Sequence, residues 1–198
     1  MSESVLEAVT SSAHVVRALL ARRSAWPLGA PAPDDAALRQ ILQAAACAPD
    51  HGQLTPWRAQ YVRDDARHAL LQRVLAHPLA QSQEALALHG KYTAKLTTAP
   101  LVLVLAARVQ EHPKVPEFEQ LLSCGAAAMN MLNAACLLGF HGFWSSTPGL
   151  LGQLLKEVMG FAPTDHMLGL LNLGTAVQKQ AVPAQRPAPE VFAKQWQP

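Results

Sequence analysis

Apolar residues recur at helical spacing in three stretches of the N-terminal half of the chain. Ser12, Asp34 or Asp35, and Asp64 stand at the starts of these stretches and are residues that cap helices well. Pro49 ends the second stretch, because proline lacks a backbone donor and clashes with the preceding turn. The apolar positions that define the three predicted helices are Val15, Val16, Leu19 and Leu20, then Leu38, Ile41, Leu42 and Ala45, and then Leu70, Leu71, Val74 and Leu75.

Strand-like runs follow these helical stretches. Residues 101–109, LVLVLAARV, are apolar at nearly every position, which is typical of a strand buried on both faces. The remaining predicted elements are strands over 57–62, 140–144 and 167–173 and helices over 79–95 and 150–159. This succession predicts an α+β or α/β sandwich that forms a single domain over residues 1–198, with extended or flexible tails at 1–11 and 183–198.

The longest predicted helix has an unusual composition. Residues 120–155, 36 in succession, include no Asp, Glu, Lys or Arg, and the helix itself is predicted over 121–138 with Gly139 at its end. Its length would suffice for a membrane span, but Asn130, Asn133 and the lack of a basic flank argue against one. We therefore expect a helix that is buried on all its faces.

A second subunit is the simplest way to bury such a helix in a chain of this size. Only 15% of the residues are charged, against about 25% in a typical soluble domain, so some of the surface is expected to be hidden. Small side chains in the helix would let another backbone approach closely. These residues are Ser123, Gly125, Ala126, Ala127 and Ala128.

Charge and cysteine usage exclude several classes of protein. The net charge of +2 provides no electrostatic attraction for nucleic acid. Cys47, Cys124 and Cys136 are far apart and odd in number, so no disulfide framework is predicted, and no CxxC or HExxH motif indicates a metal site. The first ten residues lack the basic start and apolar segment of a secretory signal, so we expect a cytoplasmic protein without a membrane anchor.

Four polar segments are candidates for binding chemistry, and each also has a purely structural explanation. Arg22-Arg23-Ser24 either complements a helix end or binds phosphate through the planar guanidinium fork. The loop 48–57 is either a surface turn or a set of hydrogen-bond donors for a heteroatom-rich ring. The segment 142–148 either packs in the core and caps a helix or binds a flat ligand. Gly174 with Lys179 either forms a turn or approaches a phosphate.

In this order, the segments resemble the nitroreductase family of FMN-dependent oxidoreductases, and most closely its small single-domain, YdjA-like subgroup. The resemblance extends from about Val15 to Lys179. The motifs that carry it are RRS at 22–24, APDH and PW within 48–57, HPKVP at 112–116, GFHGFW at 139–144 and LGT at 173–175. Each motif is unspecific alone, and their order along the chain makes the resemblance specific.

The resemblance implies a fold, an assembly and a cofactor. The fold would be a nitroreductase-like three-layer α+β sandwich in which helices flank a mostly antiparallel sheet, with the long buried helix at a homodimer interface. FMN would lie at that interface. The residues that match the family's FMN positions are Arg22, Arg23, Ser24, Cys47, His51, Trp144, Ser145, Ser146, Gly174 and Lys179. The residues that match its nicotinamide nucleotide segment are Ala134, Ala135, Cys136, Leu137, Leu138 and Gly139.

The implied activity is that of an FMN-dependent NAD(P)H oxidoreductase, which passes reducing equivalents through FMN to a small electron acceptor such as a nitroaromatic or a quinone. Because the flavin carries the chemistry, no side chain is assigned a catalytic role and no metal is expected. Cys47 and Ser145 stand where the subgroup has arginines, so phosphate binding would depend more on Arg22 and Arg23. Because two positive charges are missing at these positions, an alternative function is a flavin-binding or storage protein with little turnover. A further alternative is a helical protein-interaction module, in which the uncharged helix is the surface that contacts a partner.

Overall fold

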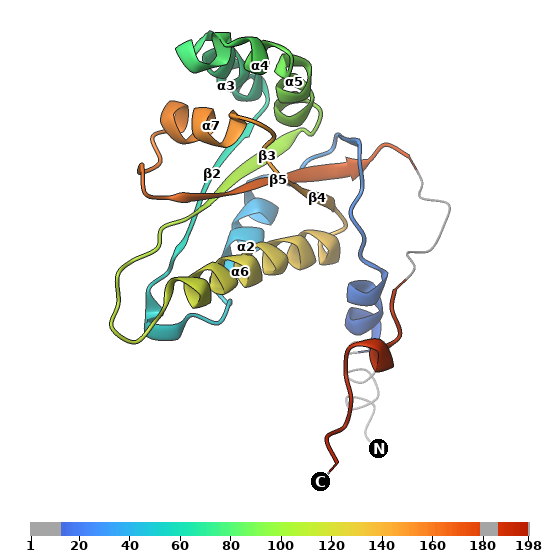
Figure 1. The fold of residues 1–198 in the computed structure, drawn as a ribbon. Coiled ribbons are helices and arrows are strands. Elements are labelled where there is room, and N and C mark those ends of the chain that lie inside the picture. Colours follow the sequence, from blue (N-terminus) through green and yellow to red (C-terminus); the bar gives the residue numbers. More distant parts are fainter. Residues whose placement is uncertain (1–12, 179–185, 198) are drawn as a thin grey trace.

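A sheet between two layers of helices forms the body of the molecule (Figure 1). The structure is a computed structural model in which residues 13–178 and 186–197 are described. One face of the sheet is covered by α2 (Asp35–Ala45) and α6 (Glu117–Leu137). The other face is covered by α3 (Asp65–Ala76), α5 (His89–Thr97) and α7 (Leu151–Met159). The three-layer α+β class expected from the sequence is confirmed.

The strands form one sheet in which the ladders between named strands are all antiparallel. Its members are β1 (Leu28–Gly29), β2 (Trp57–Arg63), β3 (Leu101–Ala107), β4 (His141–Ser145) and β5 (His166–Ala176). The order is β1-β5-β3-β2, and β4 also pairs with β5. Strand β5 therefore links all parts of the sheet except the β2 edge, and Leu103 lies opposite Leu171 at its centre.

Strand β3 explains the continuous apolar run in the sequence, because all seven of its residues are buried. Leu101, Leu103 and Leu105 pack in the cluster that includes α2 and α6, whereas Val102 and Val104 pack in the cluster that includes α3, α5 and α7. Alternate side chains of a strand point to opposite faces, so a strand covered on both sides must be apolar throughout.

Helix α6 is long, as predicted, and has no charged residue after Glu119, but a single chain buries only one of its faces. Its buried residues include Ala127 and Ala128, which pack against the chain's own sheet layer. The opposite face exposes Phe118 and Leu122, the latter by 67%, together with Met129 and Leu137. None of the helices within the described residues combines the length and apolar character that a membrane span requires.

Several predicted boundaries were wrong by a few residues. Helix α6 begins at Glu117, because two glutamates in its first turn favour a helix N-terminus. Strand β5 continues to Ala176, since β1 and β4 pair with its last residues, and Gly174 therefore lies in a strand rather than a loop. The helix expected over 79–95 is divided into η2 (Pro78–Gln81), α4 (Gln83–Leu86) and α5.

The structure describes the two ends of the chain only in part. Residues 13–21 are helical, as the first apolar stretch predicts. Within 186–197 the chain forms one short helical turn, η3 (Pro189–Val191), where an extended tail was expected. Lys179 and the tail over 1–11 lie outside the described residues.

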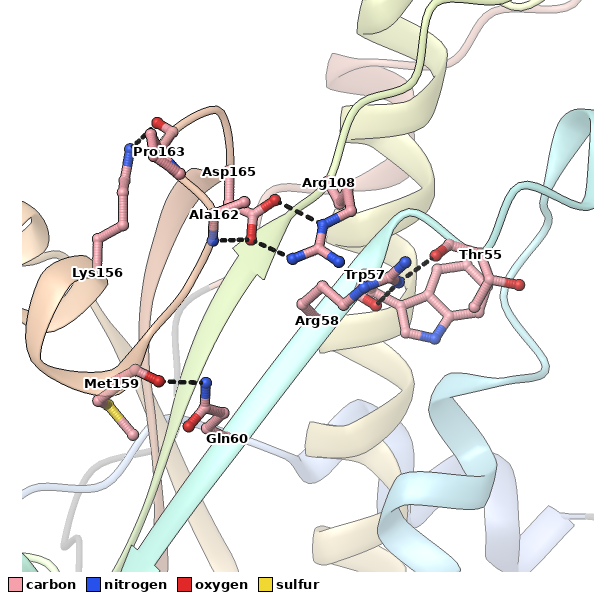
Figure 2. A network of polar contacts seen from close by, with 10 residues as sticks. All are labelled: Thr55, Trp57, Arg58, Gln60, Arg108, Lys156, Met159, Ala162, Pro163 and Asp165. Atoms are coloured by element: carbon pink, nitrogen blue, oxygen red, sulfur yellow. Dashed lines mark hydrogen bonds and ion pairs between the residues drawn. The ribbon is translucent and has the colours of Figure 1, made fainter.

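A buried carboxylate joins β3 to the turn before β5 (Figure 2). The side chain of Asp165 is fully buried and accepts two hydrogen bonds from Arg108, Nε to Oδ1 and Nη2 to Oδ2, each of 2.9 Å. It also accepts one from the backbone N–H of Ala162 at 2.9 Å. The hydrogen bonds from Arg108 hold the pKa of Asp165 below its usual value.

We expect Asp165→Asn to lower the free energy of unfolding by about 1–3 kcal/mol at pH 7, because a charged hydrogen-bonding partner is lost. A depressed carboxyl pKa stabilises the fold above the unfolded pKa of about 3.9. The difference between wild type and variant should therefore begin to shrink below about pH 4 and disappear once the pH is below the depressed pKa of Asp165 in the folded protein. Urea unfolding as a function of pH measures this.

Asp35→Asn is the matched control, because Asp35 pairs with Arg63 at the surface and is mostly exposed. Its effect should stay below about 1 kcal/mol. If the two variants lose the same amount of unfolding free energy, the buried carboxylate of Asp165 does not stabilise the fold more than a surface ion pair does.

Candidate functional site

A cavity of about 470 Å³ lies at the C-terminal end of α6, where the chain segment after residue 21 passes β4. Its volume is in the range of small-ligand sites. Four of the residues predicted from the sequence line it, namely Arg22, Arg23, Cys136 and Gly139. The other lining residues are Ala21, Leu132, Phe140, His141, Gly142, Ala176 and Gln178.

Close packing of backbone segments forms the walls of this cavity. Ser24 forms a bridge with Gly142, and the N–H of Ala25 donates to the Gly142 carbonyl at 3.3 Å. A Cβ atom at Gly142 would lie 2.5 Å from Cδ2 of Leu132, so any larger residue here would displace the Leu132 side chain. The C-terminal segment also reaches the cavity, since Nη2 of Arg186 donates to the Arg22 carbonyl at 2.6 Å.

The arginine pair, Arg22 and Arg23, determines the charge of the cavity. Both residues are half-buried, and no Asp or Glu is among the described lining residues. The helix over 13–21 and α6 both end here, and the carbonyl groups of helix C-termini carry partial negative charge. The pair can therefore complement two helix ends, bind an anion, or do both. Leu132 and Phe140 add apolar surface, so the cavity suits a ligand with one anionic and one apolar part.

A second group of predicted residues lies at the other end of α6. Cys47 follows α2 and is an exposed free thiol whose Sγ lies 3.7 Å from the Gln43 carbonyl oxygen. His51 begins the short turn η1 (His51–Gln53), and its Nδ1 lies 2.7 Å from Oε2 of Glu119 in the first turn of α6.

The loop that carries His51 is held in an uncommon backbone conformation. We call residues 50–55 the His51 loop. Gly52, Gln53 and Thr55 have positive φ angles of 77°, 53° and 47°. Such angles cost about 1–3 kcal/mol for a residue other than glycine, and they occur often at functional sites. Asp50 stabilises the loop, because its carboxylate accepts hydrogen bonds from the N–H groups of Leu54 at 3.2 Å and Thr55 at 2.7 Å.

The predicted Trp-Ser-Ser segment lies at the end of β4. Trp144 shares the α6 side of the sheet with Gly142, and its Nε1 donates to the Leu168 carbonyl at 3.0 Å. Ser145 is buried on the opposite side, where Nδ2 of Asn172 donates to its Oγ at 3.5 Å. Ser146 follows the strand and is exposed.

The segment predicted to bind nicotinamide nucleotide is only partly accessible. Cys136 and Gly139 line the cavity, whereas Ala135 is fully buried in the core. Ala134 is half-buried, and Leu137 and Leu138 are exposed. Gly174, which the resemblance assigned to FMN binding, is buried in β5 opposite His141.

One chain therefore brings the arginine pair together with Cys136 but keeps them far from His51. Glu119, which contacts His51, and Cys136 are 17 residues apart in α6, or about 25 Å along the helix axis. Figure 1 shows η1 at one end of α6 and the N-terminal segment at the other. Sequence reasoning missed Glu119, which is 68 positions from His51 and forms no motif with it.

Comparison with known proteins agrees with this architecture. Residues 19–175 match the model of the nitroreductase family. A protein of Escherichia coli (strain K12), named as a candidate NAD(P)H nitroreductase, YdjA, is 33% identical over 174 residues, which cover 88% of this chain and 94% of that protein.

Solved structures share the fold. A nitroreductase-like family protein from Bacillus cereus has a TM-score of 0.73 at 23% identity, covering 91% of this chain and 95% of that one. A candidate nitroreductase from Desulfovibrio desulfuricans, solved in complex with FMN, has a TM-score of 0.67 at 23% identity, covering 93% and 98%. The family match spans most of the sequence, and the relatives agree with it in fold and length. This chain belongs to the nitroreductase family.

Proposed function

We propose that the protein is an FMN-dependent oxidoreductase that takes reducing equivalents from NAD(P)H and passes them to a small electron acceptor such as a nitroaromatic or a quinone. Membership of the nitroreductase family supports an oxidoreductase, and a relative of the same fold has been solved with FMN. The observation that carries the proposal is the cavity, in which the arginine pair adjoins apolar side chains.

The residues of the cavity fit FMN chemically. A phosphate monoester matches the planar, bidentate donors of arginine, and an isoalloxazine ring matches apolar walls. Arg22 and Arg23 would bind the phosphate, while Leu132 and Phe140 offer surface to the apolar part. When bound, FMN would supply the two-electron redox chemistry between NAD(P)H and the acceptor, and the protein would supply binding and orientation.

A homodimer would bring the two groups of candidate residues together. An antiparallel pair of α6 helices related by a two-fold axis places the N-terminal end of one beside the C-terminal end of the other. The exposed face of α6 suits such a contact, because Phe118, Leu122 and Met129 form an apolar stripe. Gly125 lies within this stripe, and beyond its chain neighbours and the adjacent helix backbone none of the described atoms lies within 4 Å of where its Cβ would be. The arginine pair of one subunit would then face the His51 loop of its partner.

The alternative, a flavin-binding or storage protein with little turnover, is favoured by the replaced arginines. Cys47 is exposed, and the Ser145 side chain is buried on the side of the sheet away from α6. Neither residue supplies a cation. The interaction-module alternative is favoured by the exposed face of α6, which a second subunit would also explain.

Anaerobic reduction separates these functions. The purified protein should be yellow, and NADH or NADPH should bleach it within the time of a steady-state assay. Adding a nitroaromatic or a quinone should restore the colour. A yellow protein that neither nucleotide bleaches would support flavin storage, and a protein without flavin that binds no added FMN would contradict the proposal.

Removing either member of the arginine pair should weaken FMN binding. A hydrogen bond to a charged group contributes about 1.5–3 kcal/mol, so Arg22→Ala and Arg23→Ala should each raise the Kd of FMN roughly 10- to 150-fold. The variants should be purified pale and should recover activity in excess FMN. Fluorescence titration with FMN measures the effect.

Arg17→Ala is the matched control, because Arg17 lies in the helix over 13–21 that precedes the arginine pair and is exposed, with its Nε donating to the Ala13 carbonyl. This variant should bind FMN like the wild type. If both cavity variants also retain wild-type affinity, the arginines only complement the helix ends.

A further inference from the structure

The contact between His51 and Glu119 has features of a built arrangement and not of a chance surface ion pair. Nδ1 of His51 lies 2.7 Å from Oε2 of Glu119. The two side chains are 57% and 36% exposed, so their attraction alone adds little stability. Both partners are nevertheless held on rigid backbone, His51 by its strained loop and Glu119 by the first turn of α6.

The His51 loop is fixed from both sides. Asp50 accepts hydrogen bonds from two N–H groups of the loop, as described above. From the other side, Nε2 of Gln110 donates to the Leu54 carbonyl at 2.9 Å. The buried side chain of Gln120 bonds in turn to the N–H of Gln110 at 2.9 Å and to its carbonyl at 2.8 Å. The loop and the start of α6 thus form one hydrogen-bonded unit, which sets the position of His51 relative to Glu119.

This geometry determines which ring nitrogen of His51 remains for a ligand. A carboxylate only accepts hydrogen bonds, so the 2.7 Å contact requires a proton on Nδ1. Nε2 is then the acceptor in the neutral imidazole and a donor in the imidazolium. The described residues offer Nε2 no hydrogen-bonding partner. Any proton that His51 exchanges with a bound molecule must therefore pass through Nε2.

We propose that Glu119 is a positioning residue that fixes the Nδ1–H tautomer of His51, so that Nε2 faces the molecule bound at the arginine pair of the partner subunit. This inference rests on the proposed function. Two-electron reduction of a nitro group or a quinone by a hydride requires one further proton. His51 would supply it as the imidazolium: the Nε2–H bond breaks, an O–H bond forms on the acceptor, and the neutral Nδ1–H imidazole that is left takes up a proton from solvent at Nε2. The electron pair comes from NAD(P)H.

Nuclear magnetic resonance tests the tautomer without reference to activity. Long-range ¹H–¹⁵N spectra of the purified full chain, with the His51 signal assigned by its loss in His51→Gln, should show the Nδ1–H form. Glu119→Ala should shift His51 toward the Nε2–H form. Glu119→Gln should retain the native form, because the amide oxygen still accepts from Nδ1.

Glu117→Ala provides the matched control, because Glu117 also lies in the first turn of α6 but pairs with His166 at 3.5 Å. It should leave the His51 signal unchanged. An Nε2–H tautomer in the wild type, or no change in Glu119→Ala, would overturn the inference.

Kinetics distinguish this inference from the proposed function. In Glu119→Ala, kcat for the acceptor should fall at least about tenfold, as expected when a proton donor is misplaced. The affinity for FMN and the rate of bleaching by NAD(P)H should stay within about twofold of wild type. Normal acceptor reduction in Glu119→Ala would refute the role of Glu119 alone, whereas a wild type that NAD(P)H does not reduce would refute the proposed function.

Discussion

A rigid 21-residue helix separates the two groups of candidate binding residues, and the rest of the proposed site depends on this separation. The arginine pair lies beside the last turns of α6, and His51 lies beside the first turn. Glu119, which contacts His51, and Cys136, which lines the cavity, lie about 25 Å apart along the helix axis. In the proposed dimer, the α6 of a second chain would bring the two groups to one ligand.

The same helix explains why the chain contains so little charge. One face of α6 is buried against the sheet layer and α2, and the opposite face carries exposed apolar residues such as Leu122. The face against the sheet excludes charged side chains because it is buried within the chain. The opposite face would exclude them because it would be buried in the proposed dimer. The buried Asp165, bonded to the partly exposed Arg108, joins the end of β3 to the turn before β5, and the adjacent His166 contacts Glu117 in the first turn of α6.

Sequence patterns predicted those features that depend on local chemistry. Asp34 caps α2 as expected, with its side chain accepting from the N–H of Ala37, and the apolar run of β3 is buried on both faces. The sequence could not predict features that depend on distant partners. The end of β5 is set by pairing with β1 and β4, and the contact of Glu119 with His51 joins residues from separate elements.

The motifs also gave no sign of how the site is divided. As a linear list, Arg22, Cys47 and His51 read as parts of one binding site, and only the path of α6 shows that they lie at opposite ends of the chain's own helix layer. The sequence also did not distinguish Cys124 from the exposed Cys47. Burial raises the pKa of the Cys124 thiol to about 11, so this cysteine stays protonated in the core. The spacing of residues in the sequence predicted neither the separation of the site residues nor the burial of Cys124.

The most direct measurement is the activity of mixed dimers. Subunits carrying Arg22→Ala and Arg23→Ala would be combined with subunits carrying His51→Ala, purified by two different tags, and assayed without added FMN. If each site combines the arginine pair of one subunit with the His51 loop of the other, a mixed dimer has one complete site and should recover about half of the wild-type rate of acceptor reduction. If mixed dimers are no more active than the two parent variants, the site lies within one chain and the account is wrong.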